Sequence, residues 1–186
     1  MKAVVVSGDP LPGTRSLAIA KRYQAALMQY PTVQHSLFDL SIWGNLLGSA
    51  TTLQQLPDHA LDACQQLLDA NLIIIICPIF HQGLPGLFKH IFDLLDPTAL
   101  RNKIALQCTT GNLLYSNVSE QQLRPLLEYF GLFVLPIDSY IPYSELDSAP
   151  LPYCFSLNNA QQLQRIYFSV NQAVSLAKSQ QRSIVA

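Results

Sequence analysis

The sequence predicts an α/β fold: a doubly wound, three-layer sandwich in which a five-stranded parallel sheet carries helices on both faces. Strand-like and helix-like segments alternate along all 186 residues, which is the pattern of strands joined by crossover helices. Residues 72–76 are apolar at every position, as expected for a strand buried on both faces of a parallel sheet. The element count and right-handed crossovers favour strand order 2-1-3-4-5. No linker or repeat divides the chain, so we expect one domain over residues 1–186.

The first half of the chain supplies three of the expected strands. Apolar positions repeat at helical spacing from Leu17 to Tyr30, and Pro31 ends that helix. A long irregular connection, expected at residues 41–57, carries Trp43 and two glycines. In chain order the predicted elements are a strand at 2–6, a helix at 16–30, a strand at 32–40, a helix at 58–70 and a strand at 72–77.

The second half opens on the clearest helix, whose apolar stripe runs from Leu84 to Leu95 and whose first helical residue we expect to be Pro85. Ser119 and Gln122 resemble a capping box before the next helix, in which Pro125 predicts a kink or bulge. The remaining elements are a strand at 103–107, a strand at 132–141 interrupted by Pro136, a loop rich in Pro and Tyr at 142–155, and a last helix around 163–174.

Composition excludes several classes of partner. Charged residues make up 12% of the chain and the net charge is −1, so there is no basic field to attract nucleic acid or anionic lipid. No segment is long and apolar enough to cross a bilayer, and the first residues do not form a signal peptide. The four cysteines lack metal-ligand spacing, which predicts reduced thiols in a cytoplasmic protein and no metal site. With 49% apolar residues and a mean hydropathy of +0.21, we expect self-association as a homodimer or homotetramer.

Three loops should meet at one ligand site, because they follow the first, third and fourth strands and flank the switch point of the sheet. The first loop has hydroxyls and an arginine before a helix N-terminus, which favours a phosphate, although a simple helix cap explains Thr14 or Ser16 equally well. The second loop, after the third strand, offers the Phe80 ring and free backbone amides to a planar ligand. The third loop, after the fourth strand, has small and polar residues that let a ring approach the backbone. Each loop could also be an ordinary turn, but together they predict a flavin site. The residues assigned to it are Ser7, Asp9, Thr14, Arg15, Ser16, Pro78, Ile79, Phe80, His81, Thr109, Thr110, Gly111 and Asn112.

The aromatic side chains Trp43, Tyr140, Tyr143 and Tyr153 could line a pocket for nicotinamide or for an electron acceptor. Packing in the core or between subunits is the expectation that we favour for them.

Five short motifs carry a family resemblance over about the first three quarters of the chain. They are Ser-Gly-x-Pro at 7–10, Thr-Arg-Ser at 14–16, Pro-Ile-Phe-x-x-Gly-x-Pro-Gly-Leu-Phe-Lys-x-x-x-Asp-Leu-Leu at 78–95, Thr-Gly at 110–111 and Leu-Arg-Pro-Leu-Leu at 123–127. With them the chain resembles the NADPH-dependent FMN reductase family of flavodoxin-like proteins. It is most similar to the branch that supplies reduced flavin to alkanesulfonate monooxygenases. The resemblance implies FMN and NADPH or NADH as cofactors, and a monooxygenase as one acceptor.

Two departures from that family concern binding and partners. Where the family usually has Ser and then Arg to hold the flavin phosphate, this chain has Asp9 and Leu11. A carboxylate beside a phosphate is unfavourable, which predicts weak binding through Arg15 and the neighbouring hydroxyls. An ungapped alignment places Gln121 where the sulfonate-linked branch has a Tyr associated with flavin transfer, which argues against transfer to a monooxygenase.

The predicted function is therefore an NAD(P)H-dependent FMN reductase, in which hydride passes from nicotinamide C4 to flavin N5 and free flavin or a small acceptor is reduced. The cofactor performs the chemistry, so no catalytic acid, base or nucleophile is assigned. The alternative is a flavodoxin-like electron carrier, or a degenerate binding module, without turnover of NAD(P)H.

Overall fold

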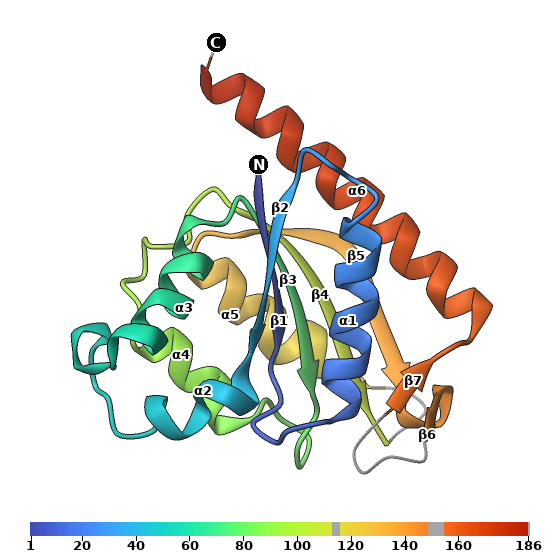
Figure 1. Ribbon diagram of the computed structural model, residues 1–186, viewed down its shortest axis with the longest axis horizontal. Coiled ribbons are helices and arrows are strands. Elements are labelled where there is room, and N and C mark those ends of the chain that lie inside the picture. Colours follow the sequence, from blue (N-terminus) through green and yellow to red (C-terminus); the bar gives the residue numbers. More distant parts are fainter. Residues whose placement is uncertain (113–115, 149–154, 186) are drawn as a thin grey trace.

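A three-layer α/β sandwich forms the molecule (Figure 1), and the computed structural model describes residues 1–112, 116–148 and 155–185. Its five-stranded sheet has the order β2-β1-β3-β4-β5, with every neighbouring pair parallel. The predicted fold class and strand order are confirmed. The strands are β1 (Lys2–Ser7), β2 (Gln34–Asp39), β3 (Leu72–Pro78), β4 (Ile104–Gly111) and β5 (Phe133–Pro142).

Six α-helices cover the two faces of this sheet among the described residues. One face carries α1 (Arg15–Leu27) and α6 (Ala160–Val185), and in Figure 1 the end of α6 projects beyond the sheet. The opposite face carries α2 (Leu40–Leu47), α3 (Asp58–Asp69), α4 (Gly86–Asp93) and α5 (Arg124–Tyr129). In the described part of the chain, no helix is long and apolar enough to cross a membrane.

The central strand β3 contributes to two hydrophobic cores at once. Ile73 and Ile75 pack with the side of α2, α3 and α4, whereas Ile74 and Ile76 pack with the side of α1 and α6. All seven residues of β3 are buried, because successive side chains of a strand point to opposite faces and both faces are covered. This is why the segment reads as an uninterrupted apolar run.

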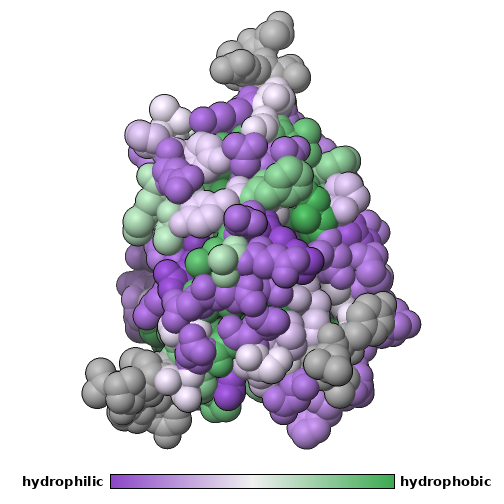
Figure 2. Space-filling view, turned by 90° about the vertical axis from the view of Figure 1, so that its right-hand side faces the viewer, coloured by the Kyte–Doolittle hydropathy of each residue, from purple (hydrophilic) through white to green (hydrophobic). Residues whose placement is uncertain are grey.

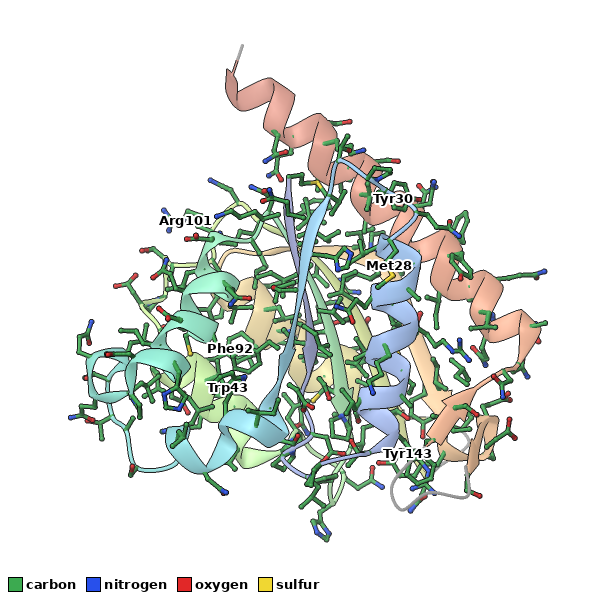
Figure 3. The ribbon with its side chains drawn as sticks, in the orientation of Figure 1. Met28, Tyr30, Trp43, Phe92, Arg101 and Tyr143 are labelled. Atoms are coloured by element: carbon green, nitrogen blue, oxygen red, sulfur yellow. The ribbon has the colours of Figure 1, made fainter. Side chains whose placement is uncertain are left out.

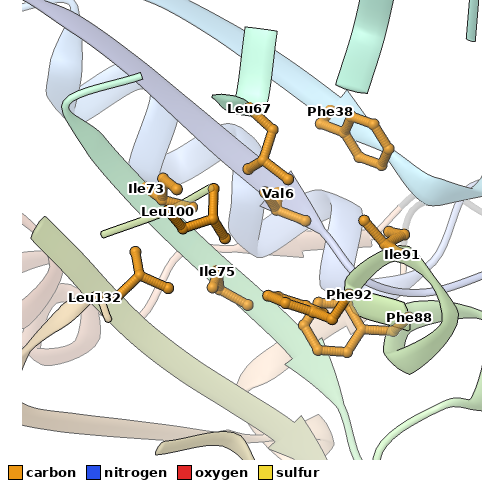
Figure 4. Close-up of a pocket in the computed structure, with 10 residues that line it drawn as sticks. All are labelled: Val6, Phe38, Leu67, Ile73, Ile75, Phe88, Ile91, Phe92, Leu100 and Leu132. Carbon is orange, nitrogen blue, oxygen red and sulfur yellow. The ribbon is translucent and has the colours of Figure 1, made fainter. Parts of the chain in front are cut away.

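A small void inside the first core is a packing gap and not a ligand site (Figure 4). Its volume is about 10 Å³. A water molecule needs at least ~10–15 Å³ and several polar partners, but this lining is entirely apolar. The lining residues are Val6, Phe38, Leu67, Ile73, Ile75, Phe88, Ile91, Phe92, Leu100 and Leu132.

The connection expected at 41–57 is more ordered than predicted. It contains the helix α2 and a short 3-10 helix, η1 (Leu53–Gln55). The Asp39 carboxylate caps the first turn of α2 by accepting a hydrogen bond from the Ser41 amide at 3.1 Å. The glycines that indicated a loop allow α4 to approach instead: a Cβ on Gly44 would lie 3.3 Å from Leu87 Cδ1. The prediction of an irregular segment was therefore wrong.

The capping box predicted at Ser119 was also wrong. Ser119 opens a π-helical turn, η2 (Ser119–Leu123), and its hydroxyl donates to Asp138 Oδ1 of β5 at 2.6 Å. This turn immediately precedes Pro125, which confirms the predicted bulge. The predicted interruption of the fifth strand is confirmed as a register shift around Pro136, opposite residues 105–107 of β4.

The loop expected at 142–155 contains regular structure in its described residues. A 3-10 turn, η3 (Tyr143–Glu145), leads into β6 (Leu146–Ser148), which pairs antiparallel with β7 (Phe155–Leu157). This two-stranded ribbon lies beside the start of α1 in Figure 1.

Candidate functional site

A pocket of about 230 Å³ opens at the carboxyl ends of β3, β4 and β5. The edge formed by the carboxyl ends of parallel strands is where doubly wound sheets bind ligands. Of the three loops predicted to meet, those after the third and fourth strands line this pocket together with two tyrosines from β5 and η3, whereas no residue of the loop after β1 is among the lining residues. The lining residues are Ile79, His81, Gln82, Gly111, Asn112, Tyr140 and Tyr143.

A tight hairpin turn after β3 forms one wall of the pocket. Phe80 and Gly83 exchange both backbone hydrogen bonds at 2.9 Å, and the central residues have positive φ, 49° at His81 and 64° at Gln82. The Ile79 amide donates to the Thr110 carbonyl at 2.9 Å, which joins the turn to β4. Within the described residues the amides of His81 and Gln82 have no backbone acceptor. Both residues line the pocket, so these amides are candidate donors to a ligand.

Gly111 lets the opposite walls approach each other. A Cβ on Gly111 would lie 3.2 Å from the Tyr140 hydroxyl and 3.5 Å from Ile79 Cβ. Tyr140 and Tyr143 were expected mainly in packing roles, yet both line the pocket. The fifth strand ends at the same edge as β3 and β4, and its pairing with β4, which sets Tyr140 opposite Thr109, was the signal that could have assigned Tyr140 to the pocket. Trp43 is partly buried and packs against the core, with its ring tilted against those of Phe38 and His59, and Tyr153 lies outside the described residues.

The two threonines near the end of β4 are buried within the protein. Both Thr109 and Thr110 are fully buried, and the Thr110 hydroxyl donates to the Ile141 carbonyl at 2.6 Å. Pro78 pairs in register with Thr110 at the last rung of β3. Pro78, Thr109 and Thr110 were predicted to bind the cofactor, but they are not among the residues that line the pocket.

The loop after β1 leads into the N-terminus of α1 and carries a group of buried donors. Ser7 and Ser16 are fully buried. Among the described residues, the hydroxyls of Ser7 and Ser16 and the Arg15 Nε have no hydrogen-bond partner, whereas the Thr14 hydroxyl lies close enough to the Asp9 carboxyl to lower its pKa by hydrogen bonding. Buried donors without acceptors are unfavourable, and at a helix N-terminus they form an environment suited to a phosphate. The residues present thus fit the phosphate end of a flavin mononucleotide.

Asp9 opposes that fit, because its carboxylate occupies the same loop. Its side chain is only 4% exposed, and Oδ1 accepts from the Leu11 amide at 3.0 Å. Burial raises the pKa of the Asp9 carboxyl, and hydrogen bonds from the Leu11 amide and the Thr14 hydroxyl act against that rise. Leu11 itself is 60% exposed, so its side chain adds no donor to the loop.

Arg15 links the loop to the pocket through aromatic rings. Its guanidinium lies 4.7 Å from the ring centroid of Tyr143 and 4.1 Å from that of Phe155. Figure 3 shows Tyr143 at the edge of the sheet between the start of α1 and β7. Burial and then the Asp9 charge raise the pKa of Tyr143, whereas the Arg15 charge lowers it. Arg15 therefore connects the loop after β1 with Tyr143, one of the residues that line the pocket.

Replacing Arg15 by Ala is expected to destabilise the fold and to weaken FMN binding together. Loss of two cation–π contacts should cost about 1–2 kcal/mol of unfolding free energy. A freed η3 and β7 should in turn displace Tyr143 and lower FMN affinity by about tenfold. Urea unfolding and fluorescence titration with FMN measure both effects. The exposed Arg165→Ala is the matched control, and equal results for the two variants would contradict the assigned role.

The cysteines do not form a reactive or metal-binding site in the part of the chain that the structure describes. Cys64, Cys77 and Cys108 are buried and free, and burial raises the pKa of Cys64 to about 11 and that of Cys108 to about 12. Thiols with such pKa values are protonated at neutral pH and react slowly. No cluster of candidate metal ligands occurs among the residues described.

Comparison with known proteins gives one family over most of the chain. The family described as NADPH-dependent FMN reductase matches residues 1–144. The chain is 33% identical over 141 residues to an NADH-dependent FMN reductase, SfnF, of Pseudomonas fluorescens, covering 75% of each chain. It is 30% identical over 148 residues to an FMN reductase (NADPH) of Pseudomonas aeruginosa, covering 79% of this chain and 80% of the relative.

Solved structures show the same fold at lower identity. An oxidoreductase from Corynebacterium diphtheriae superimposes with a TM-score of 0.80 at 23% identity, covering 96% of this chain and 97% of the other. The apo form of an NADH:FMN oxidoreductase, EMOB, gives a TM-score of 0.70 at 18% identity, covering 92% and 87%. A WrbA-like flavodoxin from Agrobacterium tumefaciens gives 0.65 at 14% identity, covering 96% and 98%. These likenesses establish the flavodoxin-like fold.

Proposed function

The chain belongs to the NADPH-dependent FMN reductase family, and from this membership we propose that it is an oxidoreductase that uses NADH or NADPH to reduce FMN. The observation that carries the proposal is the group of buried, unpartnered donors at the start of α1, joined through Tyr143 to a pocket at the carboxyl edge of the sheet. Relatives named for NADH and for NADPH support a nicotinamide as the electron donor.

The protein's part in the reaction is to bind and orient. The phosphate would be held by the hydroxyls of Ser7, Thr14 and Ser16 and by the first amides of α1. The ring system would lie against the turn after β3, where the free amides of His81 and Gln82 donate hydrogen bonds, and over Gly111. When bound, FMN supplies the hydride chemistry by accepting a hydride at N5. Tyr140 and Tyr143 would shield the pocket from water, and no side chain is required as a general acid or base.

The experiment is a turnover assay on the purified chain. Consumption of NADH and NADPH is followed with and without added FMN, and bound flavin is measured by absorbance and by release on denaturation. We expect consumption that depends on added FMN. FMN that stays bound without any consumption would instead support an electron carrier, and the absence of both binding and consumption would contradict a flavin function.

Self-association is a further proposal. Figure 2 shows the face that carries α6, where hydrophobic residues form separate patches among hydrophilic ones. On α6, Phe168 is 61% exposed and Tyr167 is 39% exposed. We propose a homodimer or homotetramer that uses such patches. Light scattering that reports a monomer at micromolar concentration would contradict it.

We also propose the class of electron acceptor: a monooxygenase is one class, alongside free flavin and small acceptors.

We further propose that the protein works in a reducing, cytoplasmic compartment, which fits the free, buried thiols of Cys64, Cys77 and Cys108.

A further inference from the structure

One side chain of the π-helical turn η2 holds the hairpin turn after β3 from outside the pocket. Gln122 Oε1 accepts from the Leu84 amide at 3.2 Å, and Gln122 Nε2 donates to the Gln82 carbonyl at 3.1 Å. The two bonds lie on either side of Gly83, where a Cβ would be only 3.3 Å from Gln122 Oε1. We refer to this pair of hydrogen bonds as the Gln122 clasp.

The turn that the clasp holds is conformationally unfavourable. Both central residues, His81 and Gln82, have positive φ without being glycine. Two-residue hairpins of this kind favour Asn-Gly, because most side chains are strained in the left-handed region. Such strain persists only where the surrounding structure enforces it. The Gln122 clasp supplies two of the contacts that enforce it.

The clasp is itself fixed to the sheet through η2. The Ser119 hydroxyl donates to Asp138 Oδ1 at 2.6 Å, and Arg124 donates to the Leu135 carbonyl at 3.2 Å while pairing with Glu120 at 2.8 Å. Asp138 and Leu135 both belong to β5. A π-helical turn adds a residue to the helix and re-aims the side chains that follow. Here it places Gln122 against the turn after β3.

We propose that Gln122 is a positioning residue for flavin binding, an inference that rests on the proposed function. Gln122 is not among the residues that line the pocket, whereas His81 and Gln82 are. Their free amides are the donors that would meet the flavin ring. Holding these amides in place before the ligand arrives lowers the ordering cost of binding. Gln122 therefore acts through the turn, without touching the ligand.

The first test compares Gln122→Ala with Gln121→Ala, which removes the neighbouring, exposed glutamine of the same turn. In the unliganded protein, amide hydrogen exchange at Leu84 should speed up at least tenfold in Gln122→Ala and stay unchanged in Gln121→Ala. With FMN, the dissociation constant should rise by about tenfold, as expected for two lost hydrogen bonds. The KM for FMN should rise in proportion and kcat should stay within about twofold.

Rescue separates positioning from a general loss of stability. Replacing Gln82 by Gly removes the conformational strain at that position, while the carbonyl that the clasp uses is kept. In the Gln122→Ala background, Gln82→Gly should restore most of the lost FMN affinity. If Gln122→Ala leaves FMN affinity unchanged, or if Gln82→Gly restores none of it, the inference is overturned.

Failure of the proposed function has a different signature. A natural chain that binds no FMN overturns that function, and with it any role of Gln122 in flavin binding. The exchange rates of the unliganded chain would still report on the clasp itself. Faster exchange at Leu84 together with unchanged FMN affinity overturns only the link between the clasp and the flavin.

Discussion

Replacing Asp9 by Asn is expected to tighten FMN binding by at least about tenfold at neutral pH. The carboxylate lies in the loop that would hold the phosphate, and it is 4% exposed, so water screens it poorly. Repulsion between two poorly screened anions a few ångströms apart amounts to about 1–4 kcal/mol. Asn keeps an oxygen that can accept from the Leu11 amide, so the loop should keep its shape. Fluorescence titration with FMN measures the change.

Two controls restrict this result to the phosphate. Riboflavin lacks the phosphate, so its affinity should be the same in Asp9→Asn and in the natural chain. Asp62→Asn, on an exposed position of α3, should leave both affinities unchanged. Asp9→Ser should act in the same direction as Asp9→Asn. Unchanged FMN affinity in both Asp9 variants would place the phosphate elsewhere.

The pH dependence of stability follows from the same carboxyl. Its pKa in the folded chain is raised above the ordinary value of 3.8, with burial as the largest cause. Between the unfolded and folded pKa values the folded chain binds more protons, so stability is lost as the pH rises through the folded pKa. Asp9→Asn should therefore be more stable than the natural chain at pH 7, and the difference should vanish below about pH 3.8. Urea unfolding across this range gives the comparison.

Replacing Gly111 by Val is expected to weaken FMN binding by about a hundredfold or more. A Cβ alone would already lie 3.2 Å from the Tyr140 hydroxyl and 3.5 Å from Ile79 Cβ. The branched side chain must therefore displace one wall or project into the pocket. The overpacking should cost about 1–3 kcal/mol of unfolding free energy, so the variant should still fold. Titration with FMN, together with circular dichroism as a check on folding, measures both effects.

Gly86→Ala is the matched control for the Gly111 variant. A Cβ at Gly86, the first residue of α4, would have no neighbour within 4 Å. It should leave FMN affinity unchanged and should not lower the stability, since Ala is favourable in a helix. Equal FMN affinity in Gly111→Val and the natural chain would show that the ring does not lie over Gly111.

The strands of the sheet could be predicted from local sequence, because the physics that places them is local. The run at 72–76 is apolar on both faces, and the helical stripe from Leu84 to Leu95 points to one core. The bulge before Pro125 was predictable for the same reason, since proline cannot donate to the helix. Helix α2 was missed because its glycines act through a long-range contact with Leu87, which no local pattern records.

The loops of the candidate site could be predicted, but the residues that complete it could not. Gly111 and the turn after β3 follow from the rule that ligands bind at the carboxyl edge of the sheet. Tyr143 was considered as a pocket residue but assigned mainly to packing, because its contact with Arg15 leaves no mark in the local sequence. Gln122 was missed as a support of the site because its hydrogen bond to Leu84 spans 38 residues of sequence. Ser119 and Gln122 have capping-box spacing, and the spacing alone does not reveal that both side chains bond to other strands and loops.

A crystal structure of the chain with FMN would show directly whether the flavin binds at the carboxyl edge of the sheet. We expect density for the ring between the turn at 80–83 and Gly111, and for the phosphate beside Ser7 and Ser16. A crevice filled by the protein's own Tyr140 and Tyr143, with FMN absent or bound elsewhere at saturating concentration, would contradict it.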